Sequence, residues 1–338
     1  MIVEMRTGAA QEEVDDVIQR AKKLGLGVQL NLGTNKVVVA LLGPNTGQLP
    51  SDIFAVLPGV ERVTRIMKPY KLAAREFKPD GTVVSVNGVD VGGRRVVVMA
   101  GPCAVEGEKQ IMAAAMVVKE AGACILRGGA YKPRTSPFAF QGLEEFGLEL
   151  LRQTKAQFNM PVVTEVVAPN DVARVSEFAD ILQVGARNMQ NYALLTEIGK
   201  SKCPVLLKRG LSATVTEWLT AADYLLAEGN EQVILCERGI RTFEDSTRFS
   251  LDVCSIPVVK KSSHLPLIVD PSHAAGHYSL VPALAKAAIA AGADGLLIEV
   301  HPNPKEALVD GLQSLTPSDF ARLMKELKPI AEAVGRYI

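Results

Sequence analysis

From residue 96 to residue 338, short apolar runs alternate with helical patterns eight times. The runs are almost continuously hydrophobic, as in VVVMA at 96–100 and GLLIEV at 295–300. Such runs are typical of parallel strands that are buried on both faces. Eight strand–helix units in about 240 residues match the size of a (β/α)8 barrel, so the sequence predicts this α/β fold. A doubly wound open sheet is the alternative, but no G-x-G-x-x-G follows the first strand to indicate a dinucleotide site.

The predicted boundaries of the eight units follow from where the apolar runs begin and end. The strands are expected at 96–100, 124–127, 161–166, 181–185, 204–209, 233–238, 266–270 and 295–300. The helices are expected near 108–121, 143–157, 170–178, 190–199, 214–228, 245–253, 280–291 and 317–334. In a barrel of this type, functional side chains gather where the strands end.

Residues 1–66 follow a different rhythm, with strands and helices in the order βαββαβ. Their elements are expected at 2–5, 10–24, 28–32, 37–42, 50–57 and 60–66, with a hairpin turn at Gly33–Asn35. This order is the ferredoxin-like arrangement. We therefore predict a small regulatory domain at 1–66, a linker with a small hairpin at 67–95, and a catalytic barrel at 96–338. A purely structural or dimerising role for the first domain is the alternative.

The composition excludes several classes of partner and location. Lys+Arg and Asp+Glu each number 37, so no bulk charge favours nucleic acid or a membrane surface. The five cysteines are scattered without a C-x-x-C pair, which suits a reducing compartment. The most apolar segment, 281–300, contains Lys286, Asp294 and Glu299, and is not expected to span a membrane. The first apolar run also contains charged residues, unlike a signal peptide, and we expect a cytoplasmic protein.

A cationic group follows the predicted strands and predicts an anion site. The segment RGGAYKPRTS, 127–136, combines three cations with two hydroxyls and two glycines. With the cations that follow other strands, the group comprises Arg127, Lys132, Arg134, Arg187, Lys208 and Arg238, and the hydroxyls are Thr135 and Ser136. Six cations at one end of a barrel repel one another, so more than one phosphate or carboxylate is implied. The alternatives are a solvated basic loop and pairing of one or two cations with Glu165, Glu237 or other carboxylates at the strand ends.

A second group of strand-end residues predicts a metal site. It consists of Cys103, His273, Glu299 and Asp310, which follow strands 1, 7 and 8 of the predicted barrel. These strands are neighbours in a closed barrel, and mixed S, N and O donors suit Zn²⁺, Fe²⁺ or Mn²⁺. His301 is a competing ligand, and a buried inert cysteine or a structural histidine remains the alternative for each residue taken singly.

Seven motifs follow the predicted strands in order: GPCAVE, LRGGAYKPRTSPFAFQG, VGARNMQN, LLKRG, ILCERGIRTFE, VDPSHAAG and EVHPNP. Together they resemble one family, the 3-deoxy-D-arabino-heptulosonate 7-phosphate (DAHP) synthases. The chain looks most like the short microbial type, in which a ferredoxin-like domain precedes the barrel. The resemblance implies condensation of phosphoenolpyruvate with erythrose 4-phosphate, the entry step of aromatic amino-acid biosynthesis. It also implies a homotetramer and inhibition by Tyr or Phe through the first domain.

The resemblance assigns roles to the residues named above. The metal ligands fall on Cys103, His273, Glu299 and Asp310, for one divalent ion such as Mn, Fe, Zn or Co. Phosphoenolpyruvate contacts fall on Arg127, Lys132, Arg187, Lys208 and Arg238, and erythrose 4-phosphate contacts on Arg134, Thr135 and Ser136. Lys132 is the candidate for proton transfer to the forming alkoxide, with His273 or a metal-bound water as alternatives.

Two other functions are weighed against this one. The 3-deoxy-D-manno-octulosonate 8-phosphate synthases use phosphoenolpyruvate with arabinose 5-phosphate on a similar barrel. Their acceptor loop resembles a lysine-alanine-asparagine run, whereas this chain has Pro133 and Arg134 after Lys132. The other alternative is a catalytically dead amino-acid sensor, and the intact Cys103 and His273 argue against it.

Overall fold

The structure is a computed structural model that describes residues 1–338 except 34–35, 45, 47 and 134–135. The predicted turn at Gly33–Asn35 and two predicted site residues, Arg134 and Thr135, therefore fall wholly or partly outside the described residues. The chain forms two compact units, one of Met1–Thr82 with Lys261–His264 and one of Val83–Lys260 with Leu265–Ile338. In the part of the chain that the structure describes, no helix combines the length and apolarity needed to cross a bilayer.

The first unit contains the predicted ferredoxin-like domain. Its strands are β1 (Ile2–Met5), β2 (Gly27–Leu32), β3 (Val37–Leu42) and β4 (Val60–Thr64), paired antiparallel in the order β2-β3-β1-β4. Its helices are α1 (Gln11–Lys23) and α2 (Asp52–Ala55). Helix α1 buries Val14, Val17 and Ala21 in one core with residues of β1 and β3, because these three positions share one face of a 3.6-residue period.

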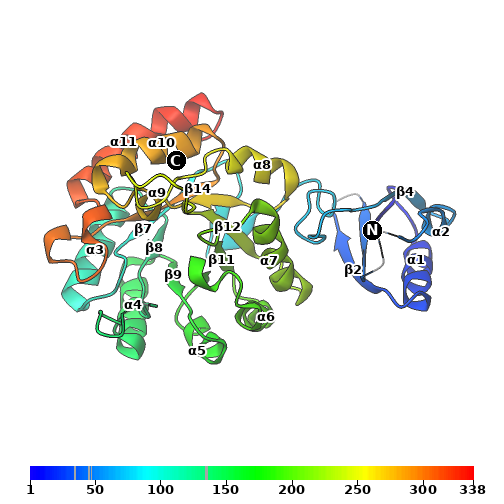
Figure 1. The fold of residues 1–338 in the computed structure, drawn as a ribbon, viewed down its shortest axis with the longest axis horizontal. Helices are drawn as coiled ribbons and strands as arrows, with labels where there is room; N and C mark the ends of the chain where they lie inside the picture. Colours follow the sequence, from blue (N-terminus) through cyan, green and yellow to red (C-terminus); the bar gives the residue numbers. More distant parts are fainter. Residues whose placement is uncertain (34–35, 45, 47, 134–135) are drawn as a thin grey trace. The chain divides into compact units, whose positions relative to one another are not determined.

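The second unit is a closed barrel of eight parallel strands, as predicted (Figure 1). The strands are β7 (Val97–Gly101), β8 (Ile125–Arg127), β9 (Val162–Glu165), β10 (Ile181–Val184), β11 (Val205–Lys208), β12 (Val233–Glu237), β13 (Leu267–Val269) and β14 (Gly295–Glu299). Each pairs in parallel with the next, and β14 pairs with β7 to close the barrel. Every strand residue is buried, which explains the continuous apolar runs in the sequence.

Helices surround this barrel on the outside (Figure 1). They are α3 (Glu108–Glu120), α4 (Glu144–Phe158), α5 (Val172–Ser176), α6 (Tyr192–Ser201), α7 (Val215–Ala227), α8 (Ser255–Ser262), α10 (Val281–Ala290) and α11 (Pro317–Ala333). A further short helix, α9 (Pro271–Ala275), follows β13 and was not predicted. Helix α5 is shorter than expected because a 3-10 turn at Pro169–Asp171 precedes it.

The predicted helix at 245–253 is wrong. The backbone amides of Arg248 and Phe249 donate to the carbonyl groups of Ala275 and Ala274, so they are not available for helical hydrogen bonds. The helix of this unit, α8, begins only after Asp252, whose carboxylate accepts a hydrogen bond from the backbone N–H of Ser255. The segment that reads as amphipathic is therefore a loop that lies against the residues following β13.

A small hairpin packs against the amino ends of the barrel strands. Its strands are β5 (Val84–Val86) and β6 (Val89–Val91), paired antiparallel. Val84, Val86 and Val91 are buried in one apolar cluster with residues from the first positions of the strands, such as Val97 and Ile125. This end of the barrel is thus filled by hydrocarbon, and the polar chemistry lies at the other end.

Candidate active site

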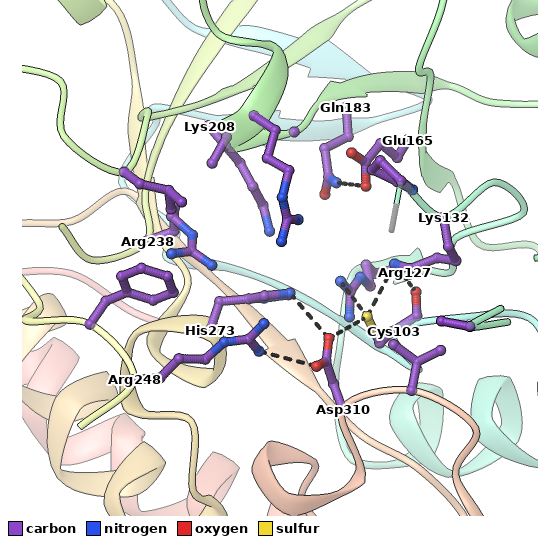
Figure 2. Close-up of a pocket in the computed structure, with 18 of the residues that line it drawn as sticks. Cys103, Arg127, Lys132, Glu165, Gln183, Lys208, Arg238, Arg248, His273 and Asp310 are labelled. Carbon is purple, nitrogen blue, oxygen red and sulfur yellow. Dashed lines mark hydrogen bonds and ion pairs between the residues drawn. The ribbon is translucent and has the colours of Figure 1, made fainter. Parts of the chain in front are cut away.

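The carboxyl ends of the strands surround a cavity of about 340 Å³ that gathers the predicted cations and metal ligands (Figure 2). The predicted site residues that line it are Cys103, Arg127, Lys132, Ser136, Arg187, Lys208, Arg238, His273 and Asp310. Glu299 lies directly behind this surface and is 1% exposed. Of the predicted set, only Arg134 and Thr135 are not placed, because they lie outside the described residues.

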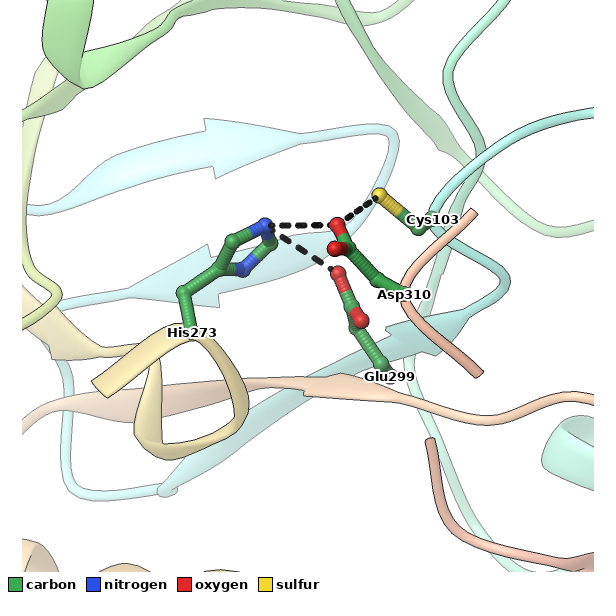
Figure 3. A group of neighbouring side chains, drawn as sticks. All are labelled: Cys103, His273, Glu299 and Asp310. Carbon is green, nitrogen blue, oxygen red and sulfur yellow. Dashed lines mark hydrogen bonds and ion pairs between the residues drawn. The ribbon is translucent and has the colours of Figure 1, made fainter. Parts of the chain in front are cut away.

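Four of these side chains converge to form a possible metal site (Figure 3). They are Cys103 after β7, His273 in α9, Glu299 at the end of β14 and Asp310 beyond it. Their donor atoms all lie within 4.8 Å of one another. His273 Nε2 is 3.2 Å from Glu299 Oε1 and 3.8 Å from Asp310 Oδ2. Cys103 Sγ lies 3.1 Å from the same Asp310 oxygen.

Asp270 fixes the orientation of His273. One carboxylate oxygen of Asp270 accepts from the backbone N–H of His273 at 2.9 Å, which caps the start of α9. The other lies 2.7 Å from His273 Nδ1 and also accepts from Lys208 Nζ at 2.6 Å. A carboxylate on the far nitrogen of an imidazole is the usual arrangement that turns the second nitrogen toward a metal.

The donor set fits a divalent cation. Burial lowers the pKa of His273, so the imidazole is neutral and carries its proton at Nδ1, facing Asp270. The lone pair of Nε2 then faces the carboxylates of Glu299 and Asp310, and this arrangement is repulsive unless a cation lies among them. Burial and the charge of Glu299 raise the pKa of the Cys103 thiol to about 12. A bound metal ion would replace that proton, as thiolate ligation requires.

Two of the cations pair with carboxylates at the same end of the barrel, which is one of the alternatives expected from the sequence. Arg127 donates to Glu299 Oε1 at 2.7 Å, and Lys208 pairs with Asp270 as described above. Glu237 and Glu165, the two carboxylates named from the sequence, accept from other side chains. Glu237 accepts from Arg209 at 2.8 Å, and Glu165 accepts from Gln183 at 3.2 Å.

Lys132 reaches the metal-ligand cluster from the loop after β8. Its Nζ donates to the backbone oxygen of Cys103 at 2.9 Å and lies 3.1 Å from Cys103 Sγ. Burial opposes the positive charge, but the Cys103 sulfur and the Glu165 carboxylate outweigh it and raise the pKa of Lys132. Gly129 is required for this approach, because a Cβ there would lie 2.7 Å from the Cys103 oxygen.

Arg238 is the cation whose surroundings most clearly call for an anion. It is only 5% exposed, and among the described residues its buried Nη1 has no hydrogen-bond partner. Its guanidinium lies over the Phe249 ring at 4.2 Å, and burial lowers its pKa. A buried guanidinium without an anion is costly, so its natural partner is a ligand. Arg187, exposed at the same cavity, provides a second cation.

Sequence reasoning missed two residues that contact the ligand carboxylates. Arg248 donates to Asp310 Oδ1 at 3.1 Å and to Gln313 Oε1 at 2.7 Å. Gln313 in turn donates to Glu299 Oε2 at 2.8 Å. Arg248 lies in the segment wrongly predicted as helix, so no pattern indicated it. His301, the competing ligand, lies outside the cluster and pairs with Glu106 at 3.2 Å.

Comparisons with known proteins agree with this geometry. The DAHP synthetase I family matches residues 77–334, and the DAHP synthase ferredoxin-like domain matches residues 1–68. A phospho-2-dehydro-3-deoxyheptonate aldolase of Thermotoga maritima is 46% identical over 99% of both chains. A crystal structure of this DAHP synthase from Thermotoga maritima has a TM-score of 0.79 and covers 99% of this chain and 98% of its own. A 2-dehydro-3-deoxyphosphooctonate aldolase of Francisella tularensis is 32% identical over 71% of this chain and 94% of its own.

The ferredoxin-like match separates the two kinds of relative. The Thermotoga protein is covered over almost its whole length, including the region that corresponds to the first unit, whereas the Francisella protein matches 262 residues. The family match also spans all eight barrel strands and every metal-ligand candidate. The chain therefore belongs to the DAHP synthetase I family and carries the ferredoxin-like domain of DAHP synthases at its N-terminus.

Proposed function

We propose that this protein catalyses the metal-dependent condensation of phosphoenolpyruvate with erythrose 4-phosphate and water. The products are 3-deoxy-D-arabino-heptulosonate 7-phosphate and phosphate, and the reaction is the first step of the shikimate pathway. The observation that carries the proposal is the buried guanidinium of Arg238, whose Nη1 has no hydrogen-bond partner among the described residues, in the same cavity as a four-donor metal cluster. The cations of such a cavity suit a ligand with several negative charges, and the metal site suits a carbonyl group that must be polarised.

The cations of the cavity account for binding of phosphoenolpyruvate. Arg238 has a buried Nη1 without a partner in the described part of the chain, and Arg187 is exposed at the same cavity, which favours these two cations for the phosphate. Arg127, Lys132 and Lys208 are held in place by their own partners and are assigned to the carboxylate of phosphoenolpyruvate. Ser136, with Arg134 and Thr135, is assigned to the phosphate of the aldehyde substrate.

Four residues would hold one divalent ion, Mn, Fe, Zn or Co: Cys103, His273, Glu299 and Asp310. When bound, the ion supplies a Lewis acid that polarises the aldehyde carbonyl. C3 of phosphoenolpyruvate forms the new bond to the aldehyde carbon, water adds at C2, and phosphate leaves by C–O cleavage. Lys132, which stays protonated and borders the cluster, donates a proton to the forming alkoxide.

The choice of aldehyde tests this proposal directly. The purified protein is supplied with phosphoenolpyruvate and either erythrose 4-phosphate or arabinose 5-phosphate, and loss of phosphoenolpyruvate is followed. We expect turnover with the four-carbon sugar and little with the five-carbon one. A preference for arabinose 5-phosphate would instead assign the activity named for the Francisella relative.

Metal dependence has its own experiment. Treatment with a chelator is expected to abolish turnover, and added Mn²⁺, Co²⁺ or Zn²⁺ is expected to restore it. Turnover that survives complete removal of metal would contradict the assignment of the four ligands. Absence of turnover with and without every metal would favour the amino-acid sensor described above.

We further propose that residues 1–66 form a regulatory domain through which Tyr or Phe inhibits, that 67–95 form a linker and hairpin, and that 96–338 form the catalytic barrel, in a cytoplasmic homotetramer. Support comes from the match of residues 1–68 to the DAHP synthase ferredoxin-like domain. Deletion of residues 1–66 is expected to remove inhibition and to leave turnover. Inhibition that persists after the deletion would place the effector elsewhere, and light scattering of the full chain tests the tetramer.

A further inference from the structure

One carboxylate outside the four-donor cluster connects the loops that carry three of its four ligands. Glu106 lies three residues after Cys103, in the turn between β7 and α3 (Glu108–Glu120), and its side chain is 9% exposed. Within its own turn, the Glu106 N–H donates to Gln110 Oε1, and Gln110 donates back to the oxygen of Ala104. This end of Glu106 is therefore fixed to the Cys103 loop.

Oε2 of the Glu106 carboxylate binds the segment that follows Glu299. His301, two residues after Glu299, is 6% exposed at its side chain and lies with Nε2 3.2 Å from Glu106 Oε2. The backbone N–H of Asn303 donates to His301 Nδ1 at 3.1 Å. Since Nδ1 accepts, the imidazole proton is on Nε2, and His301 donates it to Glu106.

Oε1 of the Glu106 carboxylate binds the loop that ends in Asp310. The backbone N–H of Leu308 donates to Glu106 Oε1 at 2.9 Å, two residues before Asp310. Val309, between them, is buried in a small apolar cluster with Cys103 and Ala104. Both oxygens of one carboxylate are thus used, each by a different loop.

Asp310 needs such support because its backbone is strained. Its φ is 55°, in the left-handed region that non-glycine residues seldom adopt. Conformations of this kind persist only where the surrounding structure imposes them, at a cost of about 1–3 kcal/mol each. The hydrogen bond from Leu308 to Glu106 fixes the backbone two residues before this strained position.

We propose that Glu106 is a positioning residue that sets the affinity of the metal site by holding the Cys103, Glu299 and Asp310 loops at one spacing. The proposal rests on the metal site assigned under the proposed function. The proposal also gives His301 a role, because its Nε2–H donates to Glu106 while its Nδ1 accepts from the backbone of Asn303. Neither residue contacts the cavity through which the substrates enter, since Glu106 and His301 border a separate shallow cleft beside α3.

The substitution Glu106→Gln tests this proposal. The amide of glutamine has one oxygen, so it accepts from Leu308 or from His301 but presents N–H to the other donor. Titration of the metal-free protein with Co²⁺, followed by the thiolate-to-cobalt charge-transfer absorption of Cys103, measures both affinity and geometry. We expect the dissociation constant to rise about 10- to 100-fold, as for other residues that support metal ligands. The thermal midpoint of the metal-free protein should remain close to the wild-type value.

Three further variants make the outcome decisive. Glu108→Gln, at an exposed carboxylate two residues after Glu106 and at the start of α3, is the matched control and should bind Co²⁺ as the wild type does. His301→Gln retains an N–H donor and should also bind nearly as the wild type, whereas His301→Ala should bind more weakly. If Glu106→Gln fails to fold, the two His301 variants still decide the matter.

The possible results separate this inference from the proposed function. A wild-type protein that gives no cobalt absorption overturns the metal site, and this inference with it. A wild-type protein that binds Co²⁺, together with Glu106→Gln and His301→Ala proteins of unchanged affinity, overturns this inference alone. A lowered thermal midpoint of the metal-free Glu106→Gln protein with unchanged Co²⁺ affinity would show a structural role only and would also overturn it.

Discussion

The two ends of the barrel are built from the same eight strands but differ in what they bury: apolar side chains at one end and charged side chains at the other. At the amino ends, the hairpin β5–β6 packs Val84, Val86 and Val91 against the first residues of the strands. At the carboxyl ends, cations and carboxylates are buried together, and Arg238 has an unpartnered buried nitrogen within the described part of the chain. The first end stabilises the fold, whereas the second holds charge that folding alone does not require. Substitutions at the two ends should therefore affect different measurements.

The largest effect is expected from Arg238→Met. Loss of the guanidinium removes a preorganised donor for the phosphate, so kcat/KM should fall about 10³-fold. The same change also removes a buried cation whose Nη1 has no partner among the residues that the structure describes, and it fills the space with hydrocarbon, so the thermal midpoint should be unchanged or higher. Steady-state kinetics and thermal unfolding of one preparation measure both quantities. A clear loss of stability would show that Arg238 stabilises the fold, and would contradict the distinction drawn between the two ends of the barrel.

Arg209 is the matched control for Arg238, one strand away and equally buried. It pairs with Glu237 at 2.8 Å and with Asp252 at 2.9 Å. Arg209→Met leaves the fully buried Glu237 without its cation, so the free energy of unfolding should fall by about 3–5 kcal/mol. Urea unfolding of the two variants gives the contrast directly. Equal stabilities of the Arg209 and Arg238 variants would contradict the distinction between paired and unpaired charge.

Most of the barrel could be predicted from sequence because its signal is local. The parallel strands are buried on both faces, so each appears as an apolar run, and the predicted strands at 96–100 and 295–300 coincide with β7 and β14 within one residue. The ends of the strands follow from these runs. Cys103, His273, Glu299 and Asp310 could therefore be grouped before any distance was known.

The errors arise where contacts distant in sequence decide the structure. The segment 245–253 has a helical pattern, but the Arg248 and Phe249 amides bind carbonyl groups that follow β13. Pairing of one or two cations with strand-end carboxylates was expected. The particular partners, Glu299 for Arg127 and Asp270 for Lys208, depend on the closure of the barrel and could not be named from the sequence. Sequence spacing identifies which charges share an end of the barrel, and only the closed structure decides how they pair.

Arg209 is buried with a counter-charge and Arg238 with an unpartnered nitrogen among the described residues. His264, three residues before β13, is instead buried in its neutral form. His264 is 4% exposed, its Nε2 donates to the Leu72 oxygen at 2.7 Å, and its Nδ1 accepts from the Thr82 hydroxyl at 2.8 Å. Burial lowers the pKa of His264 from 6.5 to about 4. The unfolded chain therefore takes up the proton first, and stability is lost as pH falls from the unfolded pKa toward the folded one.

The free energy of unfolding should thus fall by about 2–3 kcal/mol through His264 between pH 7 and pH 4.5. Urea unfolding at both pH values, compared with the His264→Gln protein, isolates this contribution from those of the carboxylates. A wild type and a variant with the same pH dependence would show that His264 is not buried as a neutral group. In that case, the contrast between the charged groups buried at the carboxyl ends and a neutral His264 would not hold.

The smallest expected effect comes from the hairpin, where Val91→Ala removes two buried methyl groups from a position with 0% exposure. The free energy of unfolding should fall by about 2 kcal/mol, from lost apolar burial and a small cavity. Because the hairpin packs at the end opposite the cavity, kcat/KM and Co²⁺ affinity should remain at wild-type values. Val83→Ala, at a 54% exposed position next to the hairpin, is the control and should change neither stability nor kinetics. A Val91→Ala protein that unfolds more easily and also binds metal more weakly would show that the two ends of the barrel are coupled through the strands.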